Sequence, residues 1–351
     1  MATLRQSIPQ VLTRQTSLEP SVEPLPAAPA DAVQWVRTHG NAVSTALFDP
    51  ACARFTTRGV DGAIAYKLAW GCAVAIGDPV CPPEDRVTLA RAFQSVAGKR
   101  GLATVFAVAS EPFAQAMATY GAAAIGFGKE LVVDPERDPS KGSKGRELRK
   151  KLTHAQKAGL RADEYDRSQF GNGMIERELE RVARGWLDNR RGPQIFLTGV
   201  RLFEAPAVTR YFHVRDGDRY IGVLTTLRLD ARNGYLLNHI LTTPDAPDGT
   251  SELLIAHTLS TLGREGCRFA TFGPSPDSEL GATMNVPSWS ERIARKVFSK
   301  CTETFHLDAR TRYRRKFQVE REEPSYLVFD PPRIGPKQIA GVLRAFNVSL
   351  A

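Results

Sequence analysis

The stretch TRYFHVRDGDRYIGVLTTLRLDARNGYLLNHILTT, residues 209–243, predicts three successive β-strands. The dipeptides Asp216–Gly217 and Asn233–Gly234 divide it, and such pairs favour the tight turns of β-hairpins. The next segment, GTSELLIAHTLSTLGREG (249–266), has the apolar period of a helix, and CRFATFGPSP (267–276) has the composition of a buried strand. A three-stranded meander followed by a helix and a strand predicts a unit of the α/β (α+β) class.

The preceding part of the chain predicts a similar order of elements. Two strands joined at Gly71 are followed by a helix, a strand, a second helix and the strand AAIGFGKELVVD (123–134). This is the order of the GNAT acyltransferase fold, so we expect two GNAT-like units in tandem. The predicted parts are a disordered tail (1–30), a first GNAT-like domain (31–140), a basic connecting helix (141–161) and a second GNAT-like domain carrying the active site (162–351).

Composition limits the class of protein. The chain has 351 residues, enough for about two domains, and a net charge of +9, which favours a polyanionic partner or an anionic surface. The five cysteines have no metal-site spacing and are expected to be buried thiols in a reducing compartment. No apolar run approaches 18 residues, so we expect no transmembrane segment and a cytoplasmic protein that contacts membranes peripherally.

The connecting segment KGSKGRELRKKLTHAQKAGL (141–160) is the strongest charge cluster in the sequence. Helical spacing places several cations on one face, where like charges repel unless a polyanion neutralises them. RNA is one expected partner; an anionic lipid surface and a solvated charged helix remain open. The candidate residues for binding RNA are Lys144, Arg146, Arg149, Lys150, Lys151 and Lys157.

The turn and helix start after residue 243 form the predicted edge of the active site. Thr250 or Ser251 is expected to cap the helix, with Glu252 in its first turn. The turn contains Asp245 and Asp248, whose charge disfavours the diphosphate of CoA and suits an α-ammonium group; turn chemistry and complementation of the helix dipole are the structural alternatives for these acids. His239 lies in the strand before this turn.

A second basic cluster near residue 315 supplies candidate substrate-binding residues. Tyr313, Arg314 and Lys316 interleave an aromatic ring with cations, which suits contact with nucleic acid. Glu303 precedes them as a possible second acid, and a salt-bridge role is its alternative. The candidate catalytic residues are therefore Glu252, Glu303 and His239. Phosphate-binding, dinucleotide-binding and metal-binding motifs are absent from the sequence, so no cofactor is expected.

Several of these segments together resemble one family. GDPV (77–80), GKELVVD followed by the basic helix, SELL, FATFGPSP and the closing block RYRRKF…SYLVFD occur in an order similar to that in the C-terminal catalytic domain of phosphatidylglycerol lysyltransferases and alanyltransferases. Arg314 and Lys316 match two basic positions of that block. The likeness covers about Asp31 to Pro331.

The resemblance implies a fold of tandem GNAT units and an enzyme that moves an aminoacyl group from aminoacyl-tRNA to a lipid hydroxyl. Ile255 and Ser325 stand where the family carries Arg, and Glu252 where it carries Asp. The freestanding form resembles fungal sterol aminoacyltransferases, which implies ergosterol as acceptor and glycine, carried by Gly-tRNA, as donor. Alternatives are a phosphatidylglycerol aminoacyltransferase, an acyl-CoA-dependent N-acyltransferase, and a non-catalytic RNA- or membrane-binding module.

Overall fold

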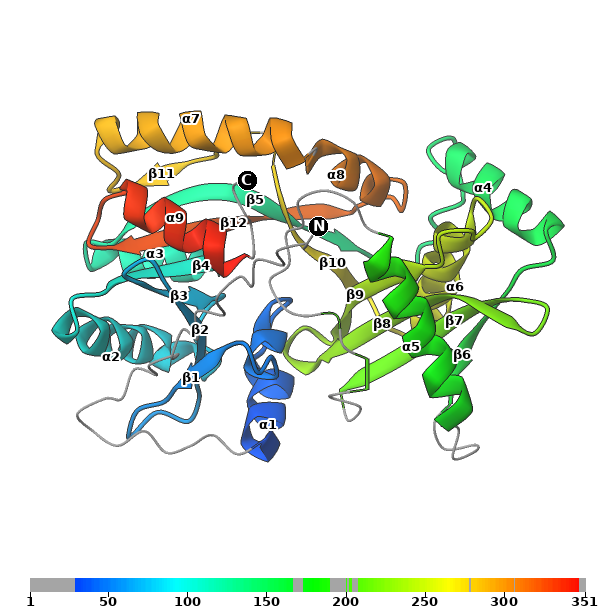
Figure 1. Ribbon diagram of the computed structural model, residues 1–351, viewed down its shortest axis with the longest axis horizontal. Helices are drawn as coiled ribbons and strands as arrows, with labels where there is room; N and C mark the ends of the chain where they lie inside the picture. Colours follow the sequence, from blue (N-terminus) through cyan, green and yellow to red (C-terminus); the bar gives the residue numbers. More distant parts are fainter. Residues whose placement is uncertain are drawn as a thin grey trace, which may run out of the picture.

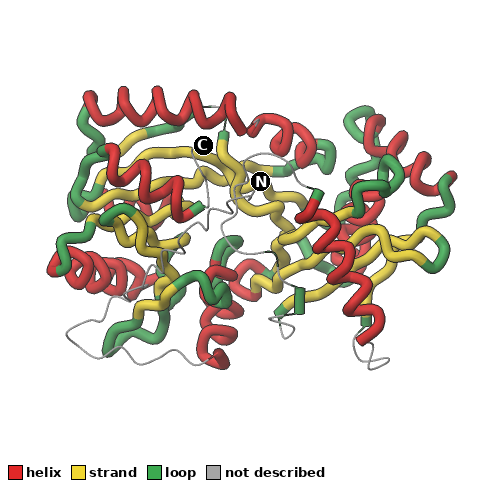
Figure 2. Tube along the Cα trace, in the orientation of Figure 1, coloured by secondary structure: helices red, strands yellow, loops and turns green. Residues whose placement is uncertain are grey.

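The computed structural model describes residues 29–166, 173–189, 200, 202–203, 208–277, 279–305 and 307–346. It is a mixed α/β structure in which one long sheet crosses the molecule and helices cover its faces (Figures 1 and 2). The α/β class predicted from the sequence is confirmed. Residues 1–28 of the predicted tail lie outside the described residues, and the first helix begins at Pro29.

The first unit has the predicted order of elements, with one additional short strand at its start. Ser110 ends a strand and accepts a hydrogen bond from the backbone N–H of Phe113 at 3.4 Å, so it caps the next helix. The elements are α1 (Pro29–His39), β1 (Ala53–Phe55), β2 (Ile64–Ala69), β3 (Cys72–Ile76), α2 (Arg86–Lys99), β4 (Ala103–Ser110), α3 (Glu111–Thr119) and β5 (Ala123–Val133).

The remainder of the chain contains the predicted meander and helices together with four short elements that the sequence did not predict: β6, β11, α8 and α9. The elements are α4 (Arg146–Lys157), β6 (Arg161–Tyr165), α5 (Gly173–Asp188), β7 (Thr209–Asp216), β8 (Arg219–Leu229), β9 (Gly234–Thr242), α6 (Thr250–Arg264), β10 (Phe269–Pro276), β11 (Thr283–Met284), α7 (Ser288–Phe305), α8 (Leu307–Arg315), β12 (Arg321–Asp330) and α9 (Pro336–Ala345).

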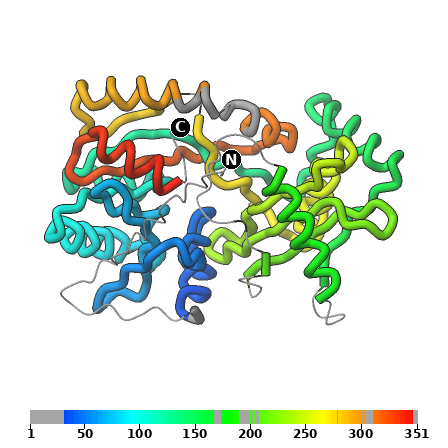
Figure 3. Tube along the Cα trace, viewed as in Figure 1, coloured from blue at the N-terminus to red at the C-terminus, as the bar shows by residue number. Residues whose placement is uncertain are grey.

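The two units exchange their last strands within the sheet. The strand order is β1-β2-β3-β4-β12-β5-β10-β9-β8-β7-β6, with β11 added beside β5. The late strand β12 is antiparallel to both β4 and β5, and β5 is antiparallel to β10 (Figures 1 and 3). Hydrogen bonding therefore runs without a break from one unit to the other, and the predicted boundaries at residues 140 and 162 stay a prediction.

Each unit contains one pair of parallel strands joined by a helix, and the two pairs differ. Strands β3 and β4 pair along all of β3, and the N–H of Gly77 extends the pairing to the carbonyl of Ala107 at 2.7 Å. Strands β9 and β10 pair only from Gly234 to Leu236 on β9, although β9 continues to Thr242. A bulge at Gly273, whose φ is +70°, shifts the register of β10 where the pairing stops. We call this divergence the β9–β10 fork.

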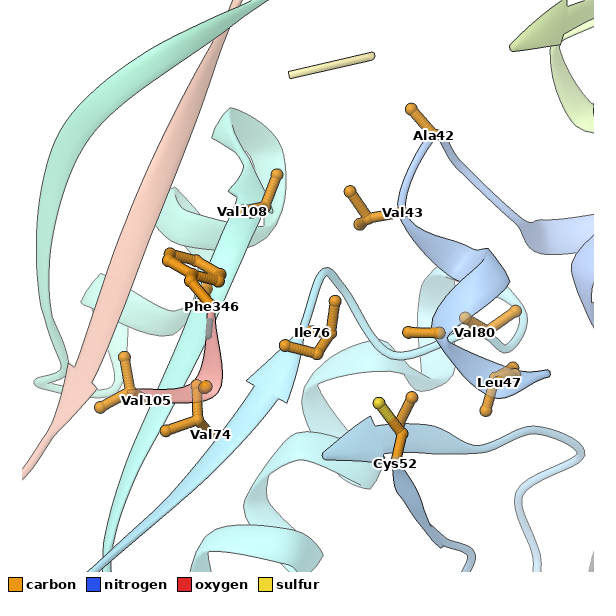
Figure 4. Close-up of a cluster of buried hydrophobic side chains, with 14 of the residues drawn as sticks. Ala42, Val43, Leu47, Cys52, Val74, Ile76, Val80, Val105, Val108 and Phe346 are labelled. Atoms are coloured by element: carbon orange, nitrogen blue, oxygen red, sulfur yellow. The ribbon is translucent and has the colours of Figure 1, made fainter. Parts of the chain in front are cut away.

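The largest core cluster ties the N-terminal segment and the C-terminal helix to the sheet. Figure 4 shows part of this cluster. Val43 and Leu47 come from the N-terminal segment, and Phe346, which follows the C-terminal helix, belongs to the same cluster as Val105 of β4. Cys52, Cys72, Cys81 and Cys267 are buried free thiols, as expected for these four. Among the described helices, none combines the length and apolar composition needed to cross a membrane.

Candidate functional site

Helix α6 begins beside the β9–β10 fork and packs against α4. Gly249 precedes the helix with φ +92°, and a Cβ at this position would lie 2.3 Å from the carbonyl oxygen of Lys151 in α4. Thr250 donates its hydroxyl to the carbonyl of Pro247 at 2.6 Å, and no side chain caps α6. The predicted cap at Thr250 or Ser251 is therefore wrong, because a glycine in the left-handed region makes the helix start.

Four side chains, two at the start of α6 and two in or just after the last turn of α8, form a connected group, which we call the Glu252 cluster: Ser251, Glu252, Tyr313 and Lys316. The ammonium of Lys316 lies 3.4 Å from Oε1 of Glu252, whose side chain is only 6% exposed. Ser251 donates to Oε2 of Glu252 at 3.0 Å, and Tyr313 donates to the Ser251 hydroxyl at 2.8 Å. Burial raises the pKa of Tyr313, and the nearby Glu252 charge raises it further, so this phenol stays protonated.

Lys316 joins the Glu252 cluster to the basic helix. Its ammonium lies 2.9 Å from Oε1 of Glu147, the acid in the first turn of α4. Burial alone would lower the pKa of Lys316, but the hydrogen bond to Glu147 and the charges of Glu147 and Glu252 outweigh burial and raise it. The hydrogen bond from Lys316 in turn lowers the pKa of Glu147. Lys316 therefore stays a cation between two carboxylates.

Helix α8 contacts both β10 and the start of α6. Nη1 of Arg314 donates to the carbonyl of Gly273 at 3.4 Å, at the bulge where β10 leaves β9. The hydroxyl of Thr311 lies 3.3 Å from that of Ser275 on β10. Tyr313 contacts α6 through Ser251, so this short helix connects β10 to the start of α6.

The two aspartates of the turn lie at the surface in ion pairs. Asp245 pairs with Arg219 at 2.5 Å, and this hydrogen bond lowers the pKa of Asp245. Asp248 pairs with Lys151 at 2.6 Å, and that bond lowers its pKa. Both carboxylates are exposed and lie outside the Glu252 cluster, whereas Glu252 is buried, so the geometry favours Glu252 over Asp245 for recognition of a buried ammonium group.

His239 and Glu303 make no described contact with the Glu252 cluster. His239 is half-buried on β9, on the part of the strand beyond its pairing with β10, and its backbone N–H donates to Thr225 at 3.2 Å. Burial lowers the pKa of His239 to about 4, so the ring is neutral near pH 7. Glu303 is exposed on α7. Their predicted catalytic roles stay predictions.

The outer face of α4 carries the cations that remain open to a partner. Arg149 donates to the carbonyls of Ser140 and Gly142, and Lys151 turns toward Asp248. Of the candidate residues in and just before α4, Lys144, Arg146, Lys150 and Lys157 are exposed and form neither an ion pair nor a hydrogen bond to the protein among the described residues. Arg146, Lys150 and Lys157 share one helical face by their spacing.

The two positions that departed from the family's basic residues are both buried. Ile255 is fully buried in a core cluster with Leu254, Leu259 and Phe212. Ser325 is 5% exposed on β12, between β4 and β5. Both side chains face packed protein. The loss of the family's Arg at these two positions therefore gives no evidence against a phospholipid as the acceptor.

Sequence reasoning found Glu252, Tyr313, Arg314 and Lys316, and the structure brings them together around α6, α8 and the β10 bulge. It missed Ser251 and Glu147 as site residues. Glu147 stood out only as the single acid of the basic segment, a weak signal that the structure explains by its pairing with Lys316. In the described part of the chain no group of His, Cys, Asp and Glu has the arrangement of a metal site.

Known proteins resemble this chain in sequence and in fold. Residues 36–329 match the family model described as phosphatidylglycerol lysyltransferase, C-terminal. The chain is 25% identical over 284 residues to the lysylphosphatidylglycerol biosynthesis bifunctional protein LysX of Mycobacterium marinum, covering 78% of this chain and 25% of that protein. A LysX from Rhodococcus opacus is 26% identical over 282 residues, covering 77% of this chain and 24% of that protein. The chain thus spans about a quarter of the length of these relatives.

Two solved structures share the fold. The C-terminal domain (DUF2156) of a putative lysylphosphatidylglycerol synthetase from Agrobacterium fabrum gives a TM-score of 0.75 at 21% identity, covering 92% of this chain and 96% of that one. The structure of L-PGS from Bacillus licheniformis gives a TM-score of 0.74 at 16% identity, with the same coverage of each chain. At these identities the likeness establishes the fold.

Proposed function

The chain belongs to the family of phosphatidylglycerol lysyltransferase C-terminal domains, and we propose that it transfers an aminoacyl group from aminoacyl-tRNA to the hydroxyl of a membrane lipid. The observation that carries this proposal is the buried Glu252–Lys316 pair beside the β9–β10 fork. Through Glu147 the same lysine is tied to the basic helix α4. A site for an aminoacyl end and a surface for a polyanion are therefore adjacent.

The reaction needs positioning more than activation, because the ester of an aminoacyl-tRNA is already reactive. The lipid hydroxyl oxygen attacks the ester carbonyl carbon and a tetrahedral oxyanion forms. The bond to the tRNA ribose oxygen then breaks, and the proton lost by the lipid hydroxyl ends on that ribose oxygen. The reaction as written requires no external oxidant, nucleotide or metal, and no acyl group bound covalently to the enzyme.

We assign Glu252 to the α-ammonium of the aminoacyl group or to the proton of the attacking hydroxyl. Both roles use a carboxylate that is buried, paired with Lys316 and held by Ser251. Tyr313 supplies a protonated phenol whose hydrogen bond fixes Ser251. Arg314 and Lys316 carry the positive charge expected near the tRNA terminus.

The exposed stripe Arg146, Lys150 and Lys157 of α4 is proposed to hold the tRNA backbone. Changing these three residues to Glu is expected to weaken aminoacyl-tRNA binding well over tenfold and to flatten its salt dependence, because phosphate contacts release counterions. Arg149 and Lys151 contact the protein itself, so they provide a matched set. If the Arg149, Lys151 double change to Ala weakens tRNA binding as much as the outer-face variant, the outer face is not the tRNA surface.

Two donor and acceptor pairs are proposed for the test. The names of the relatives give lysine and phosphatidylglycerol. The sequence resemblance to sterol aminoacyltransferases gives glycine and ergosterol. Because aminoacyl-tRNA is the donor in both, the site of action is the cytoplasmic surface of a membrane.

The test combines purified protein, charged tRNA and vesicles that contain both phosphatidylglycerol and ergosterol, with products separated by thin-layer chromatography. We expect a labelled lipid whose formation is abolished by RNase and unchanged by EDTA or CoA. Label in phosphatidylglycerol or in sterol decides the acceptor, and separate lysyl-tRNA and glycyl-tRNA reactions decide the donor. Transfer from acyl-CoA after RNase treatment would identify the acyl-CoA-dependent alternative. Binding of tRNA and vesicles without any labelled product would support the non-catalytic alternative.

A further inference from the structure

Helix α7 exposes two large apolar side chains near its start. Trp289 is 50% exposed and Ile293 is 37% exposed. They are four residues apart, so they are neighbours on the helix surface. A tryptophan and an isoleucine side by side in water are unfavourable unless another surface covers them.

The opposite face of α7 is firmly attached, which fixes the direction of the exposed one. Ser290 is buried, donates to the carbonyl of Ile334 at 3.0 Å and accepts from its N–H at 2.7 Å. Ala294 is buried in the largest core cluster. Arg295 donates to the carbonyl of Leu280 at 2.6 Å and pairs with Glu291. The exposed side chains of α7 are therefore presented by a rigid element.

Cations accompany the exposed apolar pair. Arg292 and Lys296 are exposed on the same side of α7 and have no ion pair among the described residues. Arg333, next to Ile334 and therefore close to Ser290, is exposed as well. The exposed acid on this side is Glu303, ten residues beyond Ile293, roughly 15 Å along the helix at the α-helical rise. The patch around Trp289 is therefore both apolar and positive.

We propose that the face formed by Trp289, Arg292, Ile293 and Lys296 docks on an anionic lipid surface. Tryptophan favours the headgroup level of a bilayer, an aliphatic side chain beside it can enter the acyl boundary, and Arg and Lys attract anionic headgroups. The proposal rests on the proposed lipid acceptor. In Figure 1, α7 and α4 lie at opposite ends of the upper edge of the molecule, with α8 between them. The proposed docking face and the basic helix α4 are therefore separate parts of that edge.

The test is sedimentation of the full chain with vesicles of phosphatidylcholine alone or mixed with phosphatidylglycerol, without tRNA. The wild type is expected to bind the anionic vesicles at least tenfold better than the neutral ones. The variants Trp289→Ala with Ile293→Ala, and Arg292→Glu with Lys296→Glu, are each expected to lose at least fivefold of that binding. Trp70→Ala is the matched control, because Trp70 is 69% exposed on the β2–β3 hairpin, and it is expected to change binding less than twofold.

Each variant is also assayed for tRNA binding and for its oligomeric state by light scattering. Unchanged tRNA binding shows that the variants are folded and that α7 acts separately from α4. Equal vesicle binding by wild type and α7 variants, or no binding by the wild type, would overturn the proposal. A dimer that dissociates in the Trp289, Ile293 variant would assign the face to a second copy of the chain instead. Vesicle binding through α7 with no lipid product would leave the docking face standing while the proposed reaction fails.

Discussion

The two parallel strand pairs of this molecule begin with the same local pattern and end differently. In the first unit β3 and β4 stay paired along all of β3, and Gly77 continues the ladder to Ala107. In the second unit β9 and β10 separate after Leu236, and α8 connects β10 to the start of α6. The difference arises in the residues that come after the paired segments.

Polar groups accompany this difference. The residues of β3 and β4 are almost all small or apolar, CAVAI and ATVFAVAS, and a closed ladder satisfies their backbone. At the β9–β10 fork, by contrast, a neutral histidine lies on one strand, a buried carboxylate starts the next helix, and a lysine completes the pair. The closed pair stabilises the fold, and we propose that the open pair is where side chains meet the substrate.

The largest expected effect comes from removing the cation of the Glu252 cluster. Lys316→Met leaves Glu252 buried without its partner, and breaking a buried ion pair typically costs about 3–5 kcal/mol. We expect the free energy of unfolding, measured by urea titration, to fall by about 4 kcal/mol. The double variant Lys316→Met, Glu252→Gln removes the uncompensated charge and should recover at least about half of that loss. A single variant as stable as wild type would contradict the buried pairing.

Two glycines compare the units directly. Gly249 and Gly71 both have positive φ, +92° and +74°, but only Gly249 lies against backbone of another helix. Ala at Gly71 meets nothing within 4 Å, so its cost is the left-handed conformation alone, about 1 kcal/mol. Ala at Gly249 adds a clash with Lys151, so we expect a loss of about 3 kcal/mol. Stability is measured by thermal and urea unfolding. If the Gly249 and Gly71 variants lose the same stability, the α4–α6 contact is not tight.

Glu252→Gln tests the chemistry with little change in packing. Lys316 keeps Glu147 as a partner, so the fold should persist while turnover falls at least tenfold, equivalent to about 1.4 kcal/mol. Glu84→Gln is the matched control, since Glu84 precedes α2 in the first unit and is exposed. Its activity should remain within twofold of wild type. The measurement is the initial rate of lipid aminoacylation, and full activity of Glu252→Gln would remove this residue from the mechanism.

The smallest expected effect is on pH dependence. His239 has a pKa lowered by burial to about 4, while an unfolded histidine titrates near 6.5, so the unfolded chain binds more protons between these values. Its contribution to stability is therefore complete above about pH 6.5 and is lost as pH falls toward 4. Between pH 7 and 5.5 this amounts to about 1 kcal/mol.

Unfolding of wild type and His239→Gln at pH 7 and 5.5 measures that contribution. The variant should lose about 1 kcal/mol less than wild type over this interval, and His154→Gln on exposed α4 serves as the control. Identical pH dependence in His239→Gln and wild type would show that the ring is not withdrawn from water.

The sequence predicted the helices and strands better than it predicted which strands pair with one another. Turn dipeptides and apolar periods identified the hairpin at Gly71, the meander of β7 to β9 and helix α6, because these signals are local. The placement of β12 between β4 and β5 could not be predicted, since nothing local distinguishes one strand partner from another. The fork likewise depends on where pairing stops, which a strand's own composition does not encode.

The site was predicted in part for the same reason. Glu252 and Lys316 stood out as an acid at a helix start and a cation in a basic block, but 64 residues separate them in the chain. Asp245 and Asp248 looked equally suited to an ammonium group, and their exposure at the surface sets them apart from the buried Glu252. Contacts also separate Arg149 and Lys151, which bind other parts of the protein, from the α4 cations that face solvent.

The most direct test of the central claim is to locate the aminoacyl end of a bound tRNA. A tRNA charged with a photoreactive amino acid is bound to the protein, irradiated, and the modified peptides are identified by mass spectrometry. We predict cross-links at the β9–β10 fork, in residues 237–242 and 272–276, and at the Glu252 cluster. Cross-links concentrated instead at residues 77–80, after the closed β3–β4 pair, would contradict the assignment of the chemistry to the second unit.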